Sequence, residues 1–261
     1  MTGSHRAAPG SPLAPRPLCV AHRGGAGLAP ENTLAACRRA LALGVDAVEI
    51  DVRLTRDGVP VALHDATLHR TTGAHGLLAD WPATRLQALD ASAAFPRRGP
   101  PAPPPTLAAV LALVASRAAL HVELKGEPRV PAALVEAVVA ALRQQPAAEC
   151  VLLSFDWQAL ALARQLAPAV PRGALADRWP ADAPAALAAL AAAATTWLGL
   201  RYTALTPARR AVVRAAGLRL GVWTVNRRAS LRRAVILGVD AITTDRPDRL
   251  LAILASAPPS P

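Results

Sequence analysis

Short apolar runs alternate with longer amphipathic stretches along most of this chain. The short runs are rich in β-branched and aliphatic residues, as in buried strands of a parallel sheet, whereas the longer stretches place apolar residues at helical spacing. The runs that predict strands are 18–21, 46–52, 59–64, 119–124, 150–154, 172–175, 195–200, 218–225 and 239–243. The stretches that predict helices are 30–43, 106–116, 131–143, 157–166, 184–193, 207–216 and 228–237. We therefore predict an α/β protein with a parallel sheet, and the number of units in 261 residues favours a TIM-type (β/α)8 barrel.

One pair of predicted strands does not fit a simple barrel. The residues between them, 52–58, are too few for a parallel crossover. Asp57-Gly58 is a strong signal for a two-residue hairpin turn, which would place Asp51 opposite His64. We therefore expect these two strands to form a hairpin, with one of them outside the closed barrel.

The segments outside this alternation are irregular. Residues 1–17 are rich in Pro, Gly, Ser and Ala and predict a disordered tail, and residues 252–261 predict a flexible C-terminal tail. We expect the barrel over residues 18–251. Residues 66–105 break the alternation and end in a proline-rich run. The barrel is therefore expected to be distorted, with a small insertion after the strand that ends at His64.

Composition narrows the classes of partner. The net charge is +11, which favours anionic partners such as phosphate esters, nucleic acid or membrane surfaces. Many of the arginines, however, follow the helical pattern between Arg209 and Arg233, where a solvated helix face explains them. Aromatic residues make up 3% of the chain, which argues against a stacking platform for nucleic acid. We expect a small-molecule substrate, no nucleic acid and no stable membrane association, and the sequence leaves the oligomeric state open.

The cysteines and the apolar runs bear on the compartment. Cys19, Cys37 and Cys150 are widely spaced in apolar contexts without the spacing of a metal or redox site, so they predict buried thiols in a reducing compartment. No run resembles the apolar region of a signal peptide, and the alanine-rich run 181–194 is too short and too weakly apolar to span a membrane. We therefore expect a cytoplasmic protein.

Carboxylates on two predicted strands are candidates for a metal site. Glu49 and Asp51 lie two residues apart on one strand, so their side chains share a face, and Glu123 lies near the end of another strand. Two carboxylates this close repel unless a cation lies between them, and oxygen ligands alone favour a hard cation such as Mg²⁺ or Ca²⁺. Salt bridges from Glu49 and Asp51 to arginines such as Arg53 are the alternative, and spacing alone does not decide between the two.

Basic and aromatic side chains lie at the ends of other predicted strands. His22 and His64 titrate near neutrality, as acid–base catalysis requires. Arg23 and Lys125 supply the positive charge that a phosphate-bearing substrate needs, although an exposed lysine in a turn is the alternative for Lys125. Trp223 also ends a strand, and core packing explains it equally well. The carboxyl ends of barrel strands meet on one face, so we expect these residues to form one site.

Taken together, these residues resemble those of the glycerophosphodiester phosphodiesterase family. The resemblance runs from about residue 18 to about residue 251, with the motifs in order. The matching segments are Ala21-His22-Arg23-Gly24-Gly25, Ala29-Pro30-Glu31-Asn32-Thr33, Glu49-Ile50-Asp51-Val52, Asp57-Gly58-Val59-Pro60-Val61, His64-Asp65-Ala66-Thr67-Leu68-His69-Arg70-Thr71-Thr72, Pro105-Thr106-Leu107, Val122-Glu123-Leu124-Lys125, Leu153-Ser154-Phe155-Asp156, Val222-Trp223-Thr224-Val225-Asn226 and Gly238-Val239-Asp240-Ala241-Ile242-Thr243-Thr244-Asp245-Arg246-Pro247.

The resemblance implies a distorted TIM barrel that depends on a divalent cation, similar to the cytoplasmic bacterial branch. Such enzymes hydrolyse glycerophosphodiesters, for example glycerophosphocholine or glycerophosphoethanolamine, to an alcohol and sn-glycerol 3-phosphate. The implied site residues are His22 and His64 for acid–base catalysis, Glu49, Asp51 and Glu123 for the cation, Arg23 and Lys125 for phosphate, and Glu31 and Trp223 for the glycerol end.

Two departures from the family pattern concern the substrate. Relatives tend to carry a polar residue in the strand that here reads Trp197-Leu-Gly-Leu-Arg201, and the insertion is rich in proline and arginine near Phe95–Pro105. The departing alcohol can therefore differ from choline. The alternatives are a related phosphodiesterase that acts on lysophospholipids and, from a different class, a non-catalytic anion-binding protein suggested by the positive charge.

Overall fold

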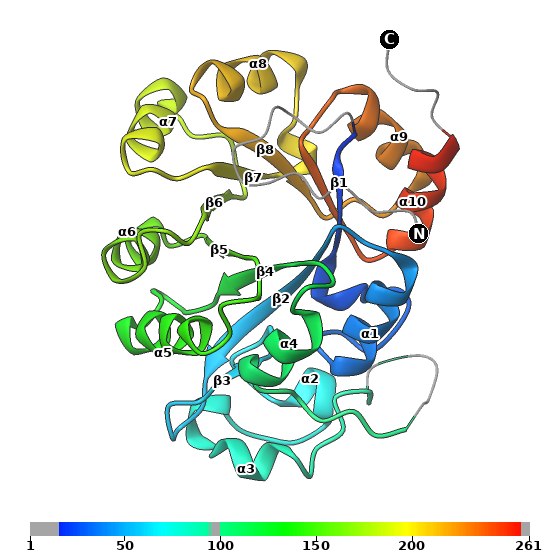
Figure 1. Ribbon diagram of the computed structural model, residues 1–261, viewed down its shortest axis with the longest axis vertical. Coiled ribbons are helices and arrows are strands. Elements are labelled where there is room, and N and C mark those ends of the chain that lie inside the picture. The colour runs from blue at the N-terminus through cyan, green and yellow to red at the C-terminus, as the bar shows by residue number, and fades with distance from the viewer. Residues whose placement is uncertain (1–15, 94, 96–99, 257–261) are drawn as a thin grey trace.

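The computed structural model describes residues 16–93, 95 and 100–256, and its centre is a closed barrel of parallel strands (Figure 1). The barrel strands are β1 (Leu18–Ala21), β2 (Ala47–Leu54), β4 (Ala119–Leu124), β5 (Cys150–Ser154), β6 (Arg172–Ala176), β7 (Trp197–Arg201), β8 (Arg219–Trp223) and β9 (Ala241–Thr244). They pair in the order β1-β9-β8-β7-β6-β5-β4-β2, and β1 pairs with β2 to close the ring. The predicted TIM-type barrel is confirmed.

Helices surround the barrel on its outside (Figure 1). They are α1 (Leu34–Leu43), α4 (Leu107–Val114), α5 (Ala132–Arg143), α6 (Trp157–Leu166), α7 (Ala183–Ala192), α8 (Pro207–Ala215), α9 (Arg228–Ile236) and α10 (Pro247–Ser256). Several of them start at a threonine cap. The hydroxyls of Thr33, Thr106 and Thr206 each accept a hydrogen bond from the backbone N–H three residues later, which satisfies a donor that the helix leaves unpaired.

The two ends of the chain differ from the predicted tails. Helix α10 continues to Ser256 and buries Ile253, so the flexible tail predicted from residue 252 is wrong for residues 252–256. Residues 257–261 and 1–15 lie outside the described residues. Arg16, within the predicted N-terminal tail, donates two hydrogen bonds to the carboxylate of Asp46, at 2.8 and 2.9 Å.

Side chains alternate between the outside and the inside of the barrel wall. On β2, Val48, Ile50 and Val52 belong to the large apolar core shared with the helices. Glu49 and Asp51, in the alternate positions, face the interior. At the amino ends of the strands the interior is filled by a small apolar cluster that includes Ala47 of β2, Trp197 of β7 and Ala241 of β9. The interior is therefore apolar where the strands begin and polar toward their carboxyl ends.

A short antiparallel strand, β3 (Pro60–Ala62), pairs with β2 outside the barrel, as expected for one member of the hairpin. The predicted register is wrong by one residue. The N–H of Thr55 donates to the carbonyl of Val59, which leaves a three-residue turn, and the residue opposite Asp51 is Leu63 rather than His64. The physical reason is Asp57, whose carboxylate accepts from the Thr55 hydroxyl at 2.6 Å and from a backbone N–H of the insertion, and so widens the turn.

The segment between β3 and α4 forms the insertion, at the lower end of Figure 1. It contains α2 (His69–Thr72), α3 (Ala83–Leu86) and a short 3₁₀ turn (Leu78–Asp80). These elements share a small apolar cluster of their own. The cluster consists of Val61, Leu63, Leu68, Leu78 and Leu86. Residues 94 and 96–99 of this segment lie outside the described residues.

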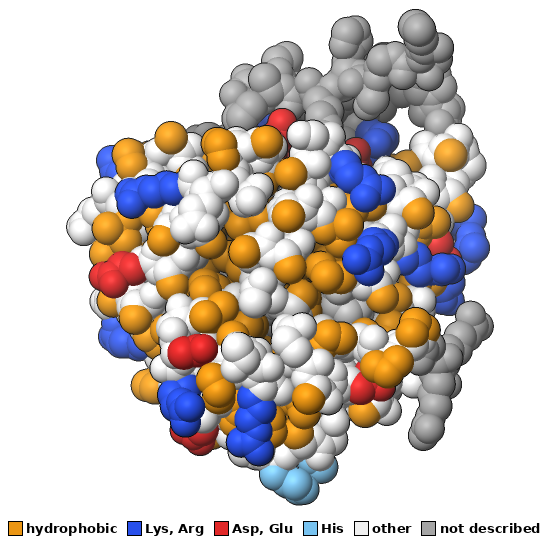
Figure 2. All heavy atoms as spheres, turned by 60° about the horizontal axis from the view of Figure 1, so that its bottom comes forward, with side chains coloured by type: hydrophobic (Ala, Val, Ile, Leu, Met, Phe, Trp, Pro, Cys, Tyr) orange, Lys and Arg blue, Asp and Glu red, His pale blue; other side chains and the backbone are white. Residues whose placement is uncertain are grey.

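Two surface features bear on the partners. In the part of the chain that the structure describes, no helix is both long and apolar enough to cross a lipid bilayer. Figure 2 shows a face on which Lys and Arg side chains are scattered among uncharged ones, with only isolated Asp and Glu side chains. On this face the excess positive charge is thus spread out rather than gathered into one patch.

Candidate active site

Three carboxylates meet inside the barrel. Asp51 of β2 lies directly opposite Glu123 of β4 in the strand register, and Glu49 shares the face of Asp51. One oxygen from each side chain lies within 4.8 Å of the other two. Glu49 and Asp51 are 3% and 1% exposed, and Oε1 of Glu49 and Oδ1 of Asp51 have no hydrogen-bond partner among the described residues. Buried oxygens without donors are costly, so this set of ligands fits a hard divalent cation.

The three acids shift one another's pKa. Burial raises the pKa of Glu49 to about 8, and the negative charge of Asp51 adds to the effect. Burial and the charge of Asp51 likewise raise the pKa of Glu123. Burial also opposes ionisation of Asp51, but the positive charges of Arg23, His64, Lys125 and His22 together outweigh it, so the pKa of Asp51 is lowered. A proton on this cluster is therefore favoured near neutral pH, and a divalent cation could take its place.

Both predicted histidines are hydrogen-bonded to a carboxylate. Nδ1 of His22 lies 2.6 Å from Oδ1 of Asp245, and Nδ1 of His64 lies 2.6 Å from Oδ1 of Asp65. Burial lowers the pKa of His22, but the hydrogen bond to Asp245 and the negative charges of Glu49 and Asp245 together outweigh burial, so the pKa is raised. Burial lowers the pKa of His64. The carboxylates fix the orientation of the rings and leave Nε2 of each for proton exchange.

Arg23 and Lys125 lie against the carboxylates. Arg23 has a left-handed backbone, with φ of 51°, and its N–H donates to Oε2 of Glu49 at 2.8 Å while its Nε lies 3.1 Å from Oδ2 of Asp51. Such a backbone costs on the order of 1–3 kcal/mol in a residue other than glycine and concentrates at functional sites. Nζ of Lys125 lies 2.9 Å from Oε1 of Glu123 and 3.2 Å from Nε2 of His64. The side chain of Lys125 is 13% exposed, so the alternative of an exposed turn lysine is wrong.

Arg53 does not neutralise the carboxylate pair. Its Nη2 lies 2.8 Å from Oε1 of Glu127, and its Nε donates to the carbonyl of His64 at 2.7 Å. The proposed salt bridges from Arg53 to Glu49 and Asp51 are therefore absent among the described contacts, and Asp51 instead pairs with Arg23.

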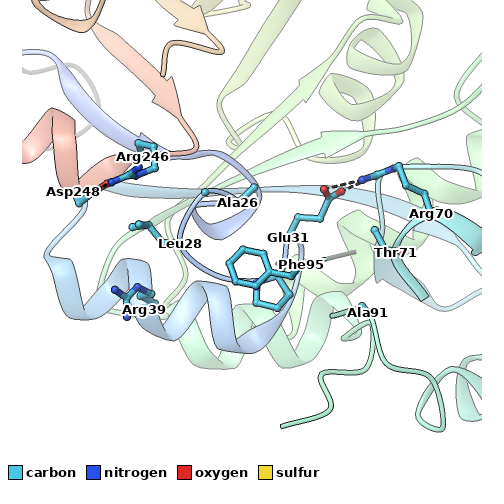
Figure 3. A pocket seen from close by; sticks show the side chains of 12 residues that line it. Ala26, Leu28, Glu31, Arg39, Arg70, Thr71, Ala91, Phe95, Arg246 and Asp248 are labelled. Atoms are coloured by element: carbon cyan, nitrogen blue, oxygen red, sulfur yellow. Dashed lines mark hydrogen bonds and ion pairs between the residues drawn. The ribbon is translucent and has the colours of Figure 1, made fainter. Parts of the chain in front are cut away.

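Glu31 lies behind Arg23 and does not line the cavity that holds the histidines. Nη1 of Arg23 donates to its Oε1 at 2.9 Å, and Arg70 donates to both of its oxygens, at 2.9 and 2.7 Å (Figure 3). Nε of Arg70 also donates to Asp65, the partner of His64, at 2.5 Å. Glu31 thus contacts Arg23 directly, and Arg70 links it to Asp65, the carboxylate that orients His64. The space that Glu31 borders is a separate cavity of about 680 Å³.

One cavity of about 330 Å³ brings most of the predicted residues together. Its lining residues are His22, Arg23, Glu49, His64, Glu123, Lys125, Leu153, Phe155, Leu175, Asp177, Arg201, Trp223, Thr224 and Thr243. The ring of Trp223 meets that of Phe155 edge to face, with centroids 5.3 Å apart. Gly199 leaves the room that Trp223 and Leu175 need, because a Cβ there would come within 2.5 Å of Leu175. Trp223 therefore borders the cavity, on the side opposite the acids.

Several residues of the site were not predicted individually. Asp65 and Asp245 hold the histidines, and Asp177 and Arg201 line the far side of the cavity. Asn32 holds Asp51 twice, donating from Nδ2 to the carboxylate at 2.9 Å and accepting the Asp51 N–H at 3.1 Å. Asn32, Asp65 and Asp245 lie inside the segments that match the family, which was their only signal in the sequence, whereas Asp177 and Arg201 lie outside those segments.

A closed β/α barrel with clustered carboxylates and two carboxylate-bound histidines at the carboxyl ends of its strands defines a TIM-barrel enzyme. Residues 22–249 match the Glycerophosphoryl diester phosphodiesterase family. The chain belongs to this family and is a phosphodiester hydrolase, which sets aside the alternative of a non-catalytic anion-binding protein.

Individual relatives agree with this membership. A glycerophosphodiester phosphodiesterase of Caldanaerobacter subterraneus subsp. tengcongensis is 32% identical over 91% of this chain and 97% of its own length. A phosphodiesterase of Oleispira antarctica, solved in complex with the product sn-glycerol-3-phosphate, is 30% identical with a TM-score of 0.86, over 92% of this chain and 98% of its own. A putative glycerophosphoryl diester phosphodiesterase of Silicibacter pomeroyi is 32% identical with a TM-score of 0.82, over 93% and 95%.

Proposed function

We propose that this enzyme hydrolyses glycerophosphodiesters, such as glycerophosphocholine and glycerophosphoethanolamine, to the alcohol and sn-glycerol 3-phosphate with the help of a divalent cation. The observation that carries the proposal is the convergence of three carboxylates within 4.8 Å, beside two histidines that line the same cavity. The product bound in the Oleispira antarctica relative supports the identity of the product.

The carboxylates are suited to hold Mg²⁺ or Ca²⁺. Glu49, Asp51 and Glu123 offer only oxygen ligands, and Glu49 and Asp51 each have a buried oxygen without a protein donor. A divalent cation held there by Glu49, Asp51 and Glu123 would supply Lewis-acid chemistry for the phosphoryl group and the nucleophile. The nucleophile is either a glycerol hydroxyl or water.

His22 and His64 are the proposed acid–base pair. One histidine accepts the proton of the nucleophile, and the other donates a proton to the oxygen of the departing alcohol. Asp245 and Asp65, each 2.6 Å from an Nδ1 atom, hold the rings in one tautomer and stabilise the imidazolium form.

Positive side chains stabilise the charge that develops on the phosphoryl group. Arg23 and Lys125 line the cavity next to the acids, where they can donate hydrogen bonds to phosphoryl oxygens. Glu31 holds the guanidinium of Arg23 in place at 2.9 Å, so we propose a positioning role for Glu31 rather than contact with the substrate. Trp223 forms part of the apolar wall that packs against the carbon atoms of the substrate.

The test is the release of sn-glycerol 3-phosphate from glycerophosphocholine and glycerophosphoethanolamine, with and without EDTA and after addition of Mg²⁺ or Ca²⁺. We expect EDTA to abolish release and a divalent cation to restore it. The substitutions His64→Ala and Glu49→Ala should each lower turnover by roughly 10²-fold or more. Glu136→Ala is a matched control, because this exposed glutamate lies on α5, remote from the cavity. Near-normal turnover in EDTA, or in either site variant, contradicts the proposal.

The same assay decides between a soluble and a lipid substrate. A lysophospholipid with the choline head group is compared with glycerophosphocholine at equal concentration. We expect faster turnover of glycerophosphocholine, because the cavity holds only about 330 Å³ and charged side chains such as Arg23, Glu49 and Lys125 line it. A strong preference for the lysophospholipid would instead identify the related lipid-cleaving activity.

A further inference from the structure

The catalytic cavity shares two wall residues with a second cavity. Asp177, which directly follows β6, and Arg201, the last residue of β7, line both of them. The second cavity has a volume of about 450 Å³ and is more open to solvent. Its remaining lining residues are Arg178, Trp179, Thr203, Ala204 and Arg209. The second cavity therefore lies next to the catalytic one at the ends of β6 and β7, where the part of a substrate that extends outward from the acids and histidines would reach it.

The second cavity carries an excess of positive charge. Three arginines and one aspartate line it, so the formal charge of the wall is 3 − 1 = +2. Arg201 and Asp177 form an ion pair with each other and largely cancel. Arg178 is exposed and forms no ion pair with any residue that the structure describes. The two uncompensated charges therefore belong to Arg178 and Arg209.

Two contacts fix the side chain of Arg209 at the wall of the second cavity. Its Nη1 donates to the carbonyl of Ala204 at 2.7 Å, and its guanidinium lies over the ring of Trp179, 5.3 Å from the centroid. A guanidinium has five N–H donors, so most of them remain for a ligand. A preorganised arginine beside an exposed one suits an anionic group such as phosphate.

A cationic alcohol such as choline is poorly matched to this route. The indole rings of Trp223 and of Trp179 could attract a quaternary ammonium. The guanidinium of Arg201 already lies 5.4 Å from the centroid of Trp223, and that of Arg209 lies 5.3 Å from the centroid of Trp179. The carboxylate of Asp177, the single acid of the second cavity, is paired with Arg201. A cation that enters the second cavity thus meets a wall of net positive charge, whose one carboxylate and one indole ring are each already paired with an arginine.

We propose that the departing alcohol occupies the second cavity, and that the enzyme prefers glycerophosphodiesters whose alcohol carries a negative charge of its own, such as a second phosphate group. The inference rests on the proposed function, in which the phosphoryl and glycerol groups lie at the acids and histidines. Hydrolysis breaks the P–O bond to the alcohol, and water supplies the hydroxyl that phosphorus gains and the proton that the alcohol gains. Arg178 and Arg209 contact the anionic group of the alcohol.

The experiment compares kcat/KM for release of sn-glycerol 3-phosphate from three diesters. Their departing alcohols are choline, which is cationic, glycerol, which is neutral, and glycerophosphoglycerol, which is anionic and comes from bis(glycerophospho)glycerol. Arg178→Gln and Arg209→Gln are assayed beside wild type. Arg117→Gln removes the same charge between α4 and β4, at the opposite end of the barrel, and serves as the control.

We expect wild type to favour the anionic alcohol over glycerol, and glycerol over choline. Each of the two substitutions should lower the ratio of anionic to choline kcat/KM on the order of fivefold, the upper range for one exposed charge pair. Arg117→Gln should leave the ratio unchanged, and added salt should reduce it in wild type. A preference for choline, or ratios in both variants equal to that of Arg117→Gln, overturns the inference while the proposed function stands. No release from any of the three diesters overturns both.

Discussion

Nδ1 of His22 lies 2.6 Å from Oδ1 of Asp245, although 223 residues separate the two in the sequence. Closure of the barrel brings them together, because β1 pairs with β9 and each residue follows its strand. Asn226 in turn donates from Nδ2 to Oδ2 of Asp245 at 2.5 Å. The ring of His22 is therefore oriented by residues from the far end of the chain.

Asp245→Asn should lower kcat on the order of 10²-fold, because an amide cannot stabilise the imidazolium form of His22 and acid–base assistance contributes roughly 10²–10⁴-fold. The loss of the negative charge should also lower the pKa of His22, which the hydrogen bond to Asp245 now raises. The limb of the pH–rate profile that belongs to His22 should then move to lower pH. Asp182→Asn, at the N-terminus of α7, is the control. An unshifted profile in Asp245→Asn contradicts the positioning role.

Glu49→Gln should affect stability in opposite directions with and without a cation. The folded-state pKa of Glu49 is raised to about 8 from the ordinary 4.5. A raised acid pKa means that the metal-free protein loses stability as pH rises between these two values, and glutamine avoids this loss because it does not ionise. We expect the metal-free variant to have the higher Tm at pH 8. Mg²⁺ or Ca²⁺ should raise the Tm of wild type and have little effect on the variant. Equal responses to the cation would exclude Glu49 as a ligand.

His121 should make the protein sensitive to acid. It lies inside the barrel, 6% exposed, with its ring 6.4 Å from that of Trp197. Burial lowers its pKa to about 4, from 6.5. Below pH 6.5 the unfolded chain binds a proton that the folded protein does not bind, so stability falls as pH drops toward 4. The total loss is about 3 kcal/mol, at roughly 1.4 kcal/mol per pKa unit.

Urea unfolding at pH 7 and pH 4 measures this loss. His121→Gln should lose about 3 kcal/mol less than wild type over this interval, because its side chain does not titrate. His75→Gln, at an exposed position in the insertion, should follow wild type. Parallel behaviour of all three proteins would contradict the burial of a neutral imidazole at this position.

Gly27→Ala should reduce activity through Asp245. A Cβ at Gly27 would lie 2.6 Å from Cδ of Arg246 and 2.8 Å from the carbonyl oxygen of Asp245, so the backbone that carries Asp245 must shift. Overpacking of this kind costs about 1–3 kcal/mol, and we expect kcat to fall at least tenfold with little change in KM, as for other shifts of catalytic geometry.

A second glycine separates this effect from simple destabilisation. Gly217 has a φ of +73° and nothing within 4 Å of a Cβ placed on it. Gly217→Ala should therefore lower the free energy of unfolding by about 1 kcal/mol through backbone strain alone. Its Tm should fall accordingly, and kcat should be unchanged. If Gly27→Ala and Gly217→Ala behave alike in both Tm and kcat, the steric route through Asp245 is wrong.

Sequence reasoning was most successful for regular elements and least successful where a side chain alters the backbone. Strands β4 and β5 and helix α6 have the predicted bounds, since their patterns are set by which face is buried. The turn after β2 was predicted incorrectly, because the carboxylate of Asp57 accepts a hydrogen bond from the insertion and the register of the hairpin shifts by one residue. Helix α10 was not predicted, because it packs against β1 and this contact depends on closure of the barrel.

The sequence by itself determined the α/β alternation, the paired carboxylates on one face of β2 and the cluster of chemically active residues at strand ends. Each of these follows from local periodicity, which depends only on the geometry of helices and strands. Only the tertiary structure decided that Asp245 orients His22, that Glu31 holds Arg23, and that Arg178 and Arg209 line the second cavity beside the catalytic one. Such contacts depend on barrel closure and on side chains from distant segments, and no spacing along the chain encodes the distance between them.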